Sequence, residues 1–245
     1  MLCISNDPIK TMGSLQGKPE HGKFKFKNDE IVKPEVYLGG DLTMMTNEDG
    51  QQCWAMSFDK YCAAAVANVE ETLAKKGQKL PSKCVTPMGS GYCPELDVTA
   101  ELKADGIQWF QEVIGQLRWA IELERVDILL ETSLLSHHLA LPREGNLEQA
   151  LHIMGYLKSH KKFRIMFDSS NPILSESLFT DYDWFDFYRG AKERLPPNMP
   201  NARGLPVTMS MFVDADHAGN KVNQKSQTGV LIFLNRAPIH WFSKR

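Results

Sequence analysis

Several marks of common protein classes are missing from this chain of 245 residues. Its apolar runs are only a few residues long, as in Val230–Leu234, whereas a membrane-spanning helix needs about 20. The N-terminus has no basic stretch followed by an apolar core, which argues against a signal peptide. With 42% hydrophobic and 24% charged residues, the composition excludes a collagen, a disordered tail and a disulfide miniprotein. We therefore expect an intracellular protein, cytoplasmic or nuclear, with no membrane partner.

Cysteine is also scarce, and its spacing indicates no cofactor. The chain has five cysteines, an odd number, and no two form a Cys-x-x-Cys pair. They are Cys3, Cys53, Cys62, Cys84 and Cys93. A zinc site needs clustered thiolates or histidines, and a secreted scaffold needs an even set. The pattern is typical of free thiols in a reducing compartment.

An excess of positive charge is absent as well. The chain has 28 Lys and Arg against 30 Asp and Glu, a net charge of −2, whereas a self-sufficient nucleic-acid binder is usually basic. The charges are nevertheless unevenly placed, and one basic cluster consists of Lys158, Lys161, Lys162 and Arg164. These groups could meet the phosphates of a duplex. Alternatively, they form a solvated helix end, where bases complement the negative pole of the helix.

The first half of the chain shows strand patterns and then helical patterns. Alternation over Val36–Leu42 predicts a strand, and Gln52–Met56 predicts its hairpin partner across Asp49-Gly50. Ser57 is a plausible N-cap for a helix that closes at Lys75-Lys76-Gly77. Residues 78–104 read as irregular because of their Pro and Gly content. Three further stripes at helical spacing predict a small antiparallel bundle, over Ile107–Ile121, Val126–His137 and Leu147–Leu157.

The second half predicts a connector and a sheet. Residues 168–206 are acidic and proline-rich, and we expect them to dock through the aromatic side chains of Phe179, Tyr182, Trp184 and Phe185. Beyond Val207, three strands are expected in a meander, at Val207–Val213, Thr228–Leu234 and Ile239–Phe242. Such an open sheet would leave one apolar face uncovered, from Val230, Ile232, Ile239 and Trp241 or their alternates.

Short motifs then occur in a specific order along the chain. One motif is the string Met211-Phe212-Val213-Asp214-Ala215-Asp216-His217-Ala218-Gly219, which is followed by Lys225–Gly229 and Ala237–Lys244. This motif resembles the opening of the RNase H domain in copia-type retrotransposon polyproteins. Earlier segments are similar to that family's palm strand, loop and helical thumb and connection region. They are Val36–Gly39, Val85–Met88, Ile114–Trp119, Arg125–Ile128 and Ile153–Lys158. Val126 departs from the family, which often has Pro there. The resemblance covers nearly the whole chain.

The resemblance implies an α+β fold with four parts. Residues 1–56 would be the C-terminal edge of a reverse transcriptase palm with its β-hairpin, and 57–167 a helical thumb and connection bundle. Residues 168–206 would be the connector, and 207–245 a truncated RNase H-like β-meander of three strands. The parent activities would be RNA-directed DNA synthesis and degradation of RNA in RNA–DNA hybrids, with Mg²⁺ as the cofactor.

The resemblance also implies that this chain alone is catalytically incomplete. The family's Tyr-x-Asp-Asp turn would precede Met1, with Met1–Ser5 as the strand that leaves it. Asp214 matches the first of four RNase H carboxylates, a vestigial metal position here, and the next carboxylate would lie beyond Arg245. We therefore expect no tightly bound Mg²⁺. A template–primer duplex or RNA–DNA hybrid would be a weak partner, bound through the basic cluster, beside the rest of the polyprotein. The alternative is a host-retained, non-catalytic protein that binds nucleic acid or another protein.

Two pairs of residues have a spacing that bears on metal binding. Asp214 and Asp216 are two apart, so in an extended strand both carboxylates would share one side. From spacing alone, the more ordinary interpretation is that both aspartates end a strand, as Asp often does. The resemblance favours a metal-ligand position for Asp214 only. Asp216 is expected to shape the turn. His137 and His138 are adjacent, and neighbours on a helix point about 100° apart, so no shared metal is expected.

Overall fold

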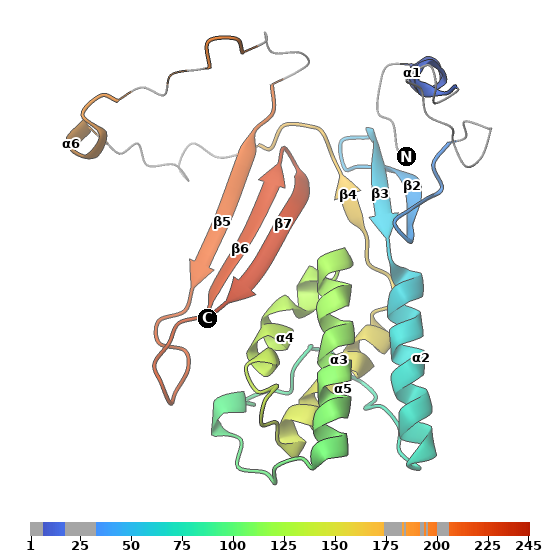
Figure 1. Cartoon of the computed structure of the whole chain (residues 1–245), viewed down its shortest axis with the longest axis vertical. Coiled ribbons are helices and arrows are strands. Elements are labelled where there is room, and N and C mark those ends of the chain that lie inside the picture. Colours follow the sequence, from blue (N-terminus) through green and yellow to red (C-terminus); the bar gives the residue numbers. More distant parts are fainter. Residues whose placement is uncertain are drawn as a thin grey trace.

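The computed structural model of the chain describes residues 7–17, 33–173, 183, 185–191, 194, 196–199 and 206–245. It contains a four-stranded sheet, a three-stranded sheet and a group of packed helices (Figure 1). The predicted α+β class is confirmed. The expected strand Met1–Ser5 and the aromatic residues Phe179, Tyr182 and Trp184 lie outside the described residues.

The first sheet is antiparallel, with its strands in the order of the chain. They are β1 (Val36–Tyr37), β2 (Gly40–Thr46), β3 (Gln52–Ser57) and β4 (Ile165–Phe167). The single strand expected over Val36–Leu42 is wrong, because the chain turns at Leu38 and Gly39, where φ is +50° and +87°. Glycine tolerates such angles without steric cost. The β2–β3 hairpin is confirmed.

Strand β4 and helix α1 are among the short elements that were not predicted. Strand β4 pairs with β3 although it follows more than 100 residues later, and three residues are too few for a periodic signal. Helix α1 (Pro8–Leu15) begins with proline in its first turn, where the missing N–H costs nothing. The Asp7 side chain caps it by accepting from the Lys10 amide at 3.0 Å.

Helix α2 (Asp59–Lys75) carries one buried stripe. The stripe is Cys62, Ala65, Val66, Val69 and Leu73, which recur at helical spacing along the sequence. Gly77 just beyond the end has φ of +67°, which suits the predicted C-terminal cap. The predicted N-cap is wrong by one residue: Phe58 holds that position, and Ser57 ends β3 while its Oγ accepts from the Asp59 amide at 3.2 Å.

The helical stripes predicted over Ile107–Ile121 and Leu147–Leu157 are confirmed, and they pack with α2 around one core. The stripe predicted over Val126–His137 is wrong, because Leu130 and His137 are exposed and the buried side chains are Ile128, Thr132 and Leu135. The elements are α3 (Ala104–Leu123), the 3-10 turn η3 (Val126–Ile128), α4 (Leu129–Ser136) and α5 (Glu144–Ser159), preceded by η2 (Pro94–Leu96) in the irregular segment. Phe110, Ile114, Leu117, Ile153 and Met154 are fully buried. At roughly 1.5–3 kcal/mol for each such side chain, this core is the main source of stability. None of the helices in the described ranges is long and apolar enough to cross a membrane.

The second sheet is the predicted meander. It consists of β5 (Met209–Ala215), β6 (Thr228–Leu234) and β7 (Ala237–Lys244), all antiparallel. Strand β7 begins earlier than expected because the β6–β7 turn is only two residues, Asn235 and Arg236, and Asn235 has φ of +54°. Pro238 is accommodated at a bulge, where Ile239 is the extra residue.

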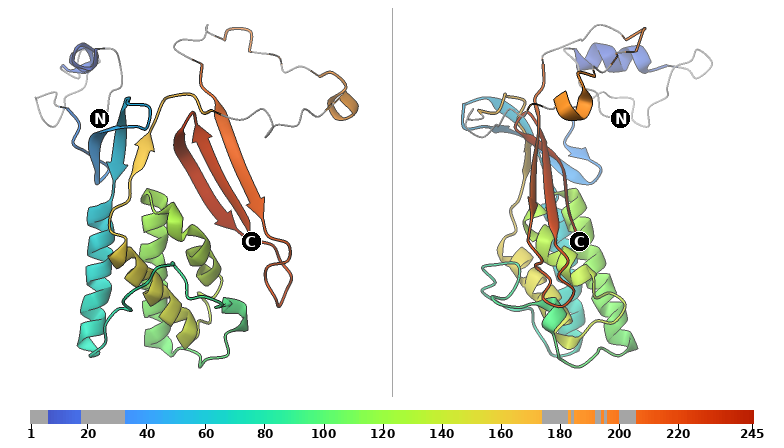
Figure 2. Two further views of the ribbon diagram at one scale, coloured as in Figure 1. Left: turned by 180° about the vertical axis from the view of Figure 1, so that it is seen from behind. Right: turned by 90° about the vertical axis from the view of Figure 1, so that its left-hand side faces the viewer.

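The meander lies alongside the helices, on the side of α4, whereas β2–β4 lie at one end of α2 (Figures 1 and 2). Hydrogen bonds hold it to the helices: Trp241 Nε1 donates to the Ile121 carbonyl at 2.9 Å, Ser133 Oγ donates to the Ser243 carbonyl at 3.0 Å, and Gln227 Nε2 donates to Ser133 Oγ at 2.9 Å. Trp241 is therefore not part of an uncovered face. The expected docking of Phe185 is wrong, since this residue of α6 (Phe185–Tyr188) is 63% exposed.

Candidate nucleic-acid interface and metal position

Asp214 is the penultimate residue of β5 and is exposed. Its cross-strand partner on β6 is Gly229, which has no side chain that could cover the Asp214 carboxylate. Among the described residues, no group of three His, Cys, Asp or Glu side chains could hold a metal ion. A pair of magnesium ions needs several carboxylates, so the described residues around Asp214 do not by themselves fit Mg²⁺.

Asp216 is engaged in the loop that follows β5. Strand β5 ends at Ala215, so Asp216 belongs to the following loop and not to the strand. Its Oδ1 accepts from the amides of Gln227 at 2.7 Å and Gly219 at 3.3 Å. A Cβ at Gly219 would lie 1.9 Å from Asp216 Oδ2, so the loop requires glycine there. Asp216 closes the loop between β5 and β6.

The basic cluster occupies the end of α5 and the connection to β4. Lys158 is already paired, because its Nζ lies 2.6 Å from Glu70 Oε1 on α2. Within the described part of the chain, Lys161, Lys162 and Arg164 pair with no carboxylate. Arg164 makes one weak contact, Nη1 to Met45 Sδ at 3.6 Å. Three of the four predicted cations therefore remain available to an anionic partner.

A buried arginine fixes this connection, and the prediction missed it. Arg125, 1% exposed, donates from Nη1 to the His160 carbonyl at 2.9 Å. Its Nε and Nη2 form a two-point contact with the Asp127 carboxylate at 2.9 and 2.7 Å. On the other side, the Phe163 amide donates to Asp59 Oδ1 at 3.2 Å. The Arg-x-Asp spacing inside the motif Arg125–Ile128 was the available signal.

Glu124 lies beside Arg125 and is completely buried. Neither of its carboxylate oxygens has a hydrogen-bond partner of good geometry. Burial raises the pKa of Glu124 to about 7, and Asp59 and Asp127 add to the rise. The Phe58 amide and the Arg125 guanidinium act in the opposite direction. Burial also raises the pKa of the neighbouring Cys62 thiol to about 11, which makes it a poor nucleophile.

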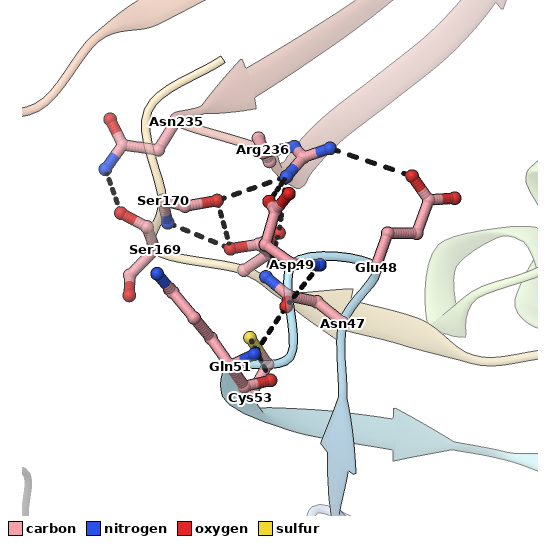
Figure 3. Close-up of polar contacts among 10 residues, drawn as sticks. Asn47, Glu48, Asp49, Gln51, Cys53, Ser169, Ser170, Asn235 and Arg236 are labelled. Atoms are coloured by element: carbon pink, nitrogen blue, oxygen red, sulfur yellow. Dashed lines mark hydrogen bonds and ion pairs between the residues drawn. The ribbon is translucent and has the colours of Figure 1, made fainter. Parts of the chain in front are cut away.

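A polar joint connects the two sheets (Figure 3). Arg236, in the β6–β7 turn, forms an ion pair with Asp49 of the β2–β3 turn and lies 3.6 Å from Asp168, which follows β4. Asp168 is 6% exposed and accepts from Asn47 Nδ2 at 3.0 Å and from Ser170 Oγ at 2.6 Å. Although burial acts to raise it, these hydrogen bonds and Arg236 hold the pKa of Asp168 below its ordinary value.

Asn235 completes the joint by donating from Nδ2 to the Ser169 carbonyl at 2.7 Å. The neutral and charged contacts together set how the strand that carries Asp214 lies relative to the hairpin. No sequence signal pointed to them, because the joint unites three turns far apart in the chain.

Comparison with known proteins gives one relative. The chain is 23% identical over 216 residues to the transposon Ty5-1 protein of Saccharomyces cerevisiae. This chain is distantly related to a transposon protein. The alignment covers 88% of the chain but 55% of the relative, so the chain spans about half the length of the curated protein that it matches. No family model and no solved structure matches.

Proposed function

We propose that the chain is a segment of a copia-type retrotransposon reverse transcriptase/RNase H. The whole polyprotein would synthesise DNA on an RNA template and degrade the RNA of RNA–DNA hybrids. Support comes from the order of the motifs, from a hairpin, helices and a meander in the same order, and from the similarity to a transposon protein. The segment would hold the nucleic acid, while catalysis would need carboxylates that other segments supply.

The basic connection after α5 carries this proposal. Lys161, Lys162 and Arg164 are exposed, and the chain around them is held by Arg125 at His160 and by Asp59 at Phe163. Anchored backbone keeps the cations close together, so less ordering is required when a duplex binds. Each phosphate neutralised would release counterions, which makes binding salt-dependent. With a net charge of −2, the chain gains little long-range attraction, so the affinity would be weak.

Strand β5 offers a surface for the rest of the polyprotein. Its side chains are more exposed than those of β6, with Met209, Met211, Phe212 and Val213 each at least 54% exposed. Contiguous apolar surface of this kind marks an interaction site. The relative is longer than this chain, and the remainder of such a polyprotein is the partner that we propose for β5.

The binding experiment measures anisotropy of a fluorescent RNA–DNA hybrid at several salt concentrations. The variant Lys161→Gln/Lys162→Gln/Arg164→Gln should bind more weakly, and the slope of log K against log salt should flatten by about two to three units. A control with the same loss of charge is Lys75→Gln/Lys79→Gln/Lys103→Gln, at exposed positions elsewhere. Equal slopes for both triple variants would contradict the proposed interface.

The catalytic part of the proposal is tested in a polyprotein extended beyond Arg245. There, Asp214→Asn should abolish magnesium-dependent cleavage of the RNA strand, because a metal ligand is lost. Asp216→Asn should keep most of the activity, since an amide oxygen can still accept the loop hydrogen bonds. Full activity of the Asp214→Asn polyprotein would refute the assignment of Asp214.

A further inference from the structure

A second group of cationic and neutral donors converges away from the basic cluster. An open pocket of about 470 Å³ lies between the helices and the β5–β6 loop. The lining residues that matter here are Glu95, His137, His138, Asn220, Lys225 and Arg245. They come from η2, the end of α4, the loop and the residue after β7, so the pocket exists only when the meander is seated against the helices.

Both histidines line this pocket. Helix α4 ends at Ser136, with His137 as its C-cap, so His138 lies beyond the helix and the 100° rule no longer separates them. Burial, and then the Arg245 guanidinium, lower the pKa of both imidazoles. Arg245 and both imidazoles line the same pocket, so three groups that can carry positive charge lie close together, while a hydrogen bond with the Gln227 side chain acts to raise the pKa of His137.

Two further donors lack a protein partner. Arg245 Nε is buried and has no acceptor among the described residues. Asn220 is 3% exposed, and its Oδ1 accepts from the amides of Val222 and Asn223, whereas in the described part of the chain its Nδ2 donates to no protein atom. A buried donor without an acceptor, such as Arg245 Nε, is costly unless a ligand satisfies it.

Glu95 is the carboxylate of the lining, and it is already engaged. Its Oε1 accepts from the Lys221 amide at 3.0 Å. Although burial acts to raise it, this hydrogen bond and the nearby Arg245 and Lys221 keep the pKa of Glu95 below its ordinary value. Asp97 is the other acid that faces His138. Within the lining of the pocket, which does not include Asp97, the two positive charges of Lys225 and Arg245 outnumber the negative charge of Glu95, and protonated histidines would add to the excess.

We propose that this pocket binds a phosphate group, held by Arg245 and Lys225 with His137, His138 and Asn220 as further donors. The phosphate could belong to a nucleic-acid backbone or to a free nucleotide or inorganic ion, since all present the same oxygens. Binding would favour the imidazolium forms and would therefore strengthen as pH falls. This proposal does not rest on the proposed function, because the pocket shares no residue with the basic cluster.

The experiment is an NMR titration of the imidazole carbon-bound protons of His137 and His138 with inorganic phosphate at constant ionic strength. Both signals should shift saturably, and more strongly at pH 6 than at pH 8. Arg245→Gln and Lys225→Gln should each weaken binding about tenfold, the effect of losing one charge-assisted contact. Lys244→Gln, which removes the same charge outside the lining, should leave the affinity unchanged.

Two further arms identify the source of the phosphate. A nucleoside monophosphate and a short oligonucleotide are titrated in the same way. Tighter binding of the oligonucleotide than of phosphate assigns the site to a nucleic-acid backbone, and equal binding assigns it to a free anion; both support the pocket. Linear, non-saturating shifts with every probe, or equal losses in Lys244→Gln and Arg245→Gln, would overturn it.

Discussion

At the scale of single residues, the decisive groups are charges placed where water is excluded. Arg125 and Glu124 are neighbours, yet they are satisfied very differently. Arg125 has two contacts to Asp127 and one to a carbonyl, whereas Glu124 has no good hydrogen bond. Burial of an unpaired carboxylate is costly, so the folded state favours its protonated form.

This difference makes stability depend on pH through Glu124. An unfolded glutamate has a pKa of about 4.3, and the folded value is about 7. The folded state therefore holds more protons between these values, and the contribution to the free energy of unfolding falls as pH rises through that window, by an amount of the order of 3 kcal/mol. Above pH 7, the contribution of Glu124 to the free energy of unfolding no longer changes with pH. In urea unfolding, the free energy of unfolding of Glu124→Gln should rise relative to that of wild type between pH 5 and pH 8. A difference that is the same at both pH values would contradict the buried, protonated state.

Arg125 should tolerate no conservative replacement. Lysine keeps the charge but cannot bind the Asp127 carboxylate at two points and reach the His160 carbonyl as well. We expect Arg125→Lys to lower the free energy of unfolding by about 2–4 kcal/mol. Arg118→Lys, on the exposed surface of α3, serves as the control and should change it little. The measurement is again urea unfolding, and equal midpoints for the two variants would count against the role of Arg125.

At the scale of elements, close approach of backbones matters as much as side-chain packing. Gly155 on α5 lies against the irregular segment: a Cβ there would be 2.6 Å from the Pro81 carbonyl oxygen and 2.9 Å from Cys84 Sγ. Gly115 on α3 has nothing within 4 Å of the same position. Both glycines belong to motifs quoted from the sequence, but only the structure separates their roles.

Alanine at these two glycines should have opposite effects. Gly155→Ala should push α5 away from residues 81–84 and should therefore destabilise the folded protein by about 1–3 kcal/mol. Gly115→Ala meets open space and should stabilise by up to about 1 kcal/mol, because alanine is the better helix former. Thermal unfolding of the two variants beside wild type gives the comparison. The packing of α5 on residues 81–84 would be refuted by a stabilising Gly155→Ala.

At the scale of the whole molecule, the joint around Arg236 holds the meander against the hairpin. Ion pairs to Asp49 and Asp168 and the Asn235 contact to Ser169 connect three turns (Figure 3). Since Arg236 is 30% exposed and its partners include the solvated Glu48 and Asp49, we give the joint a modest strength of about 1–2 kcal/mol.

Loss of Arg236 should therefore loosen the joint without unfolding the core. In Arg236→Gln, amides of the β2–β3 turn and of Ser170 should exchange with solvent roughly tenfold faster, as a loss of about 1.4 kcal/mol implies. Amides of α3 and α5 should be unchanged. Arg118→Gln is the charge-matched control. Unchanged exchange at the turn, or faster exchange throughout the helices, would show that Arg236 does not act at the joint.

Local patterns in the sequence determined most elements and the α+β class. The stripe from Cys62 to Leu73 and the alternation in β3 are periodic, and burial on one face is what such periods encode. The sequence also predicted the basic cluster and the position of Asp214 near the end of β5, because both depend only on residues that are neighbours in the chain. Only the tertiary structure decided that Lys158 is paired with Glu70, that Arg125 anchors the basic connection, and that His137 and His138 meet Arg245 in a pocket. These contacts join residues up to about 100 positions apart, where no short-range spacing carries information, and their strength depends on the burial that packing alone creates.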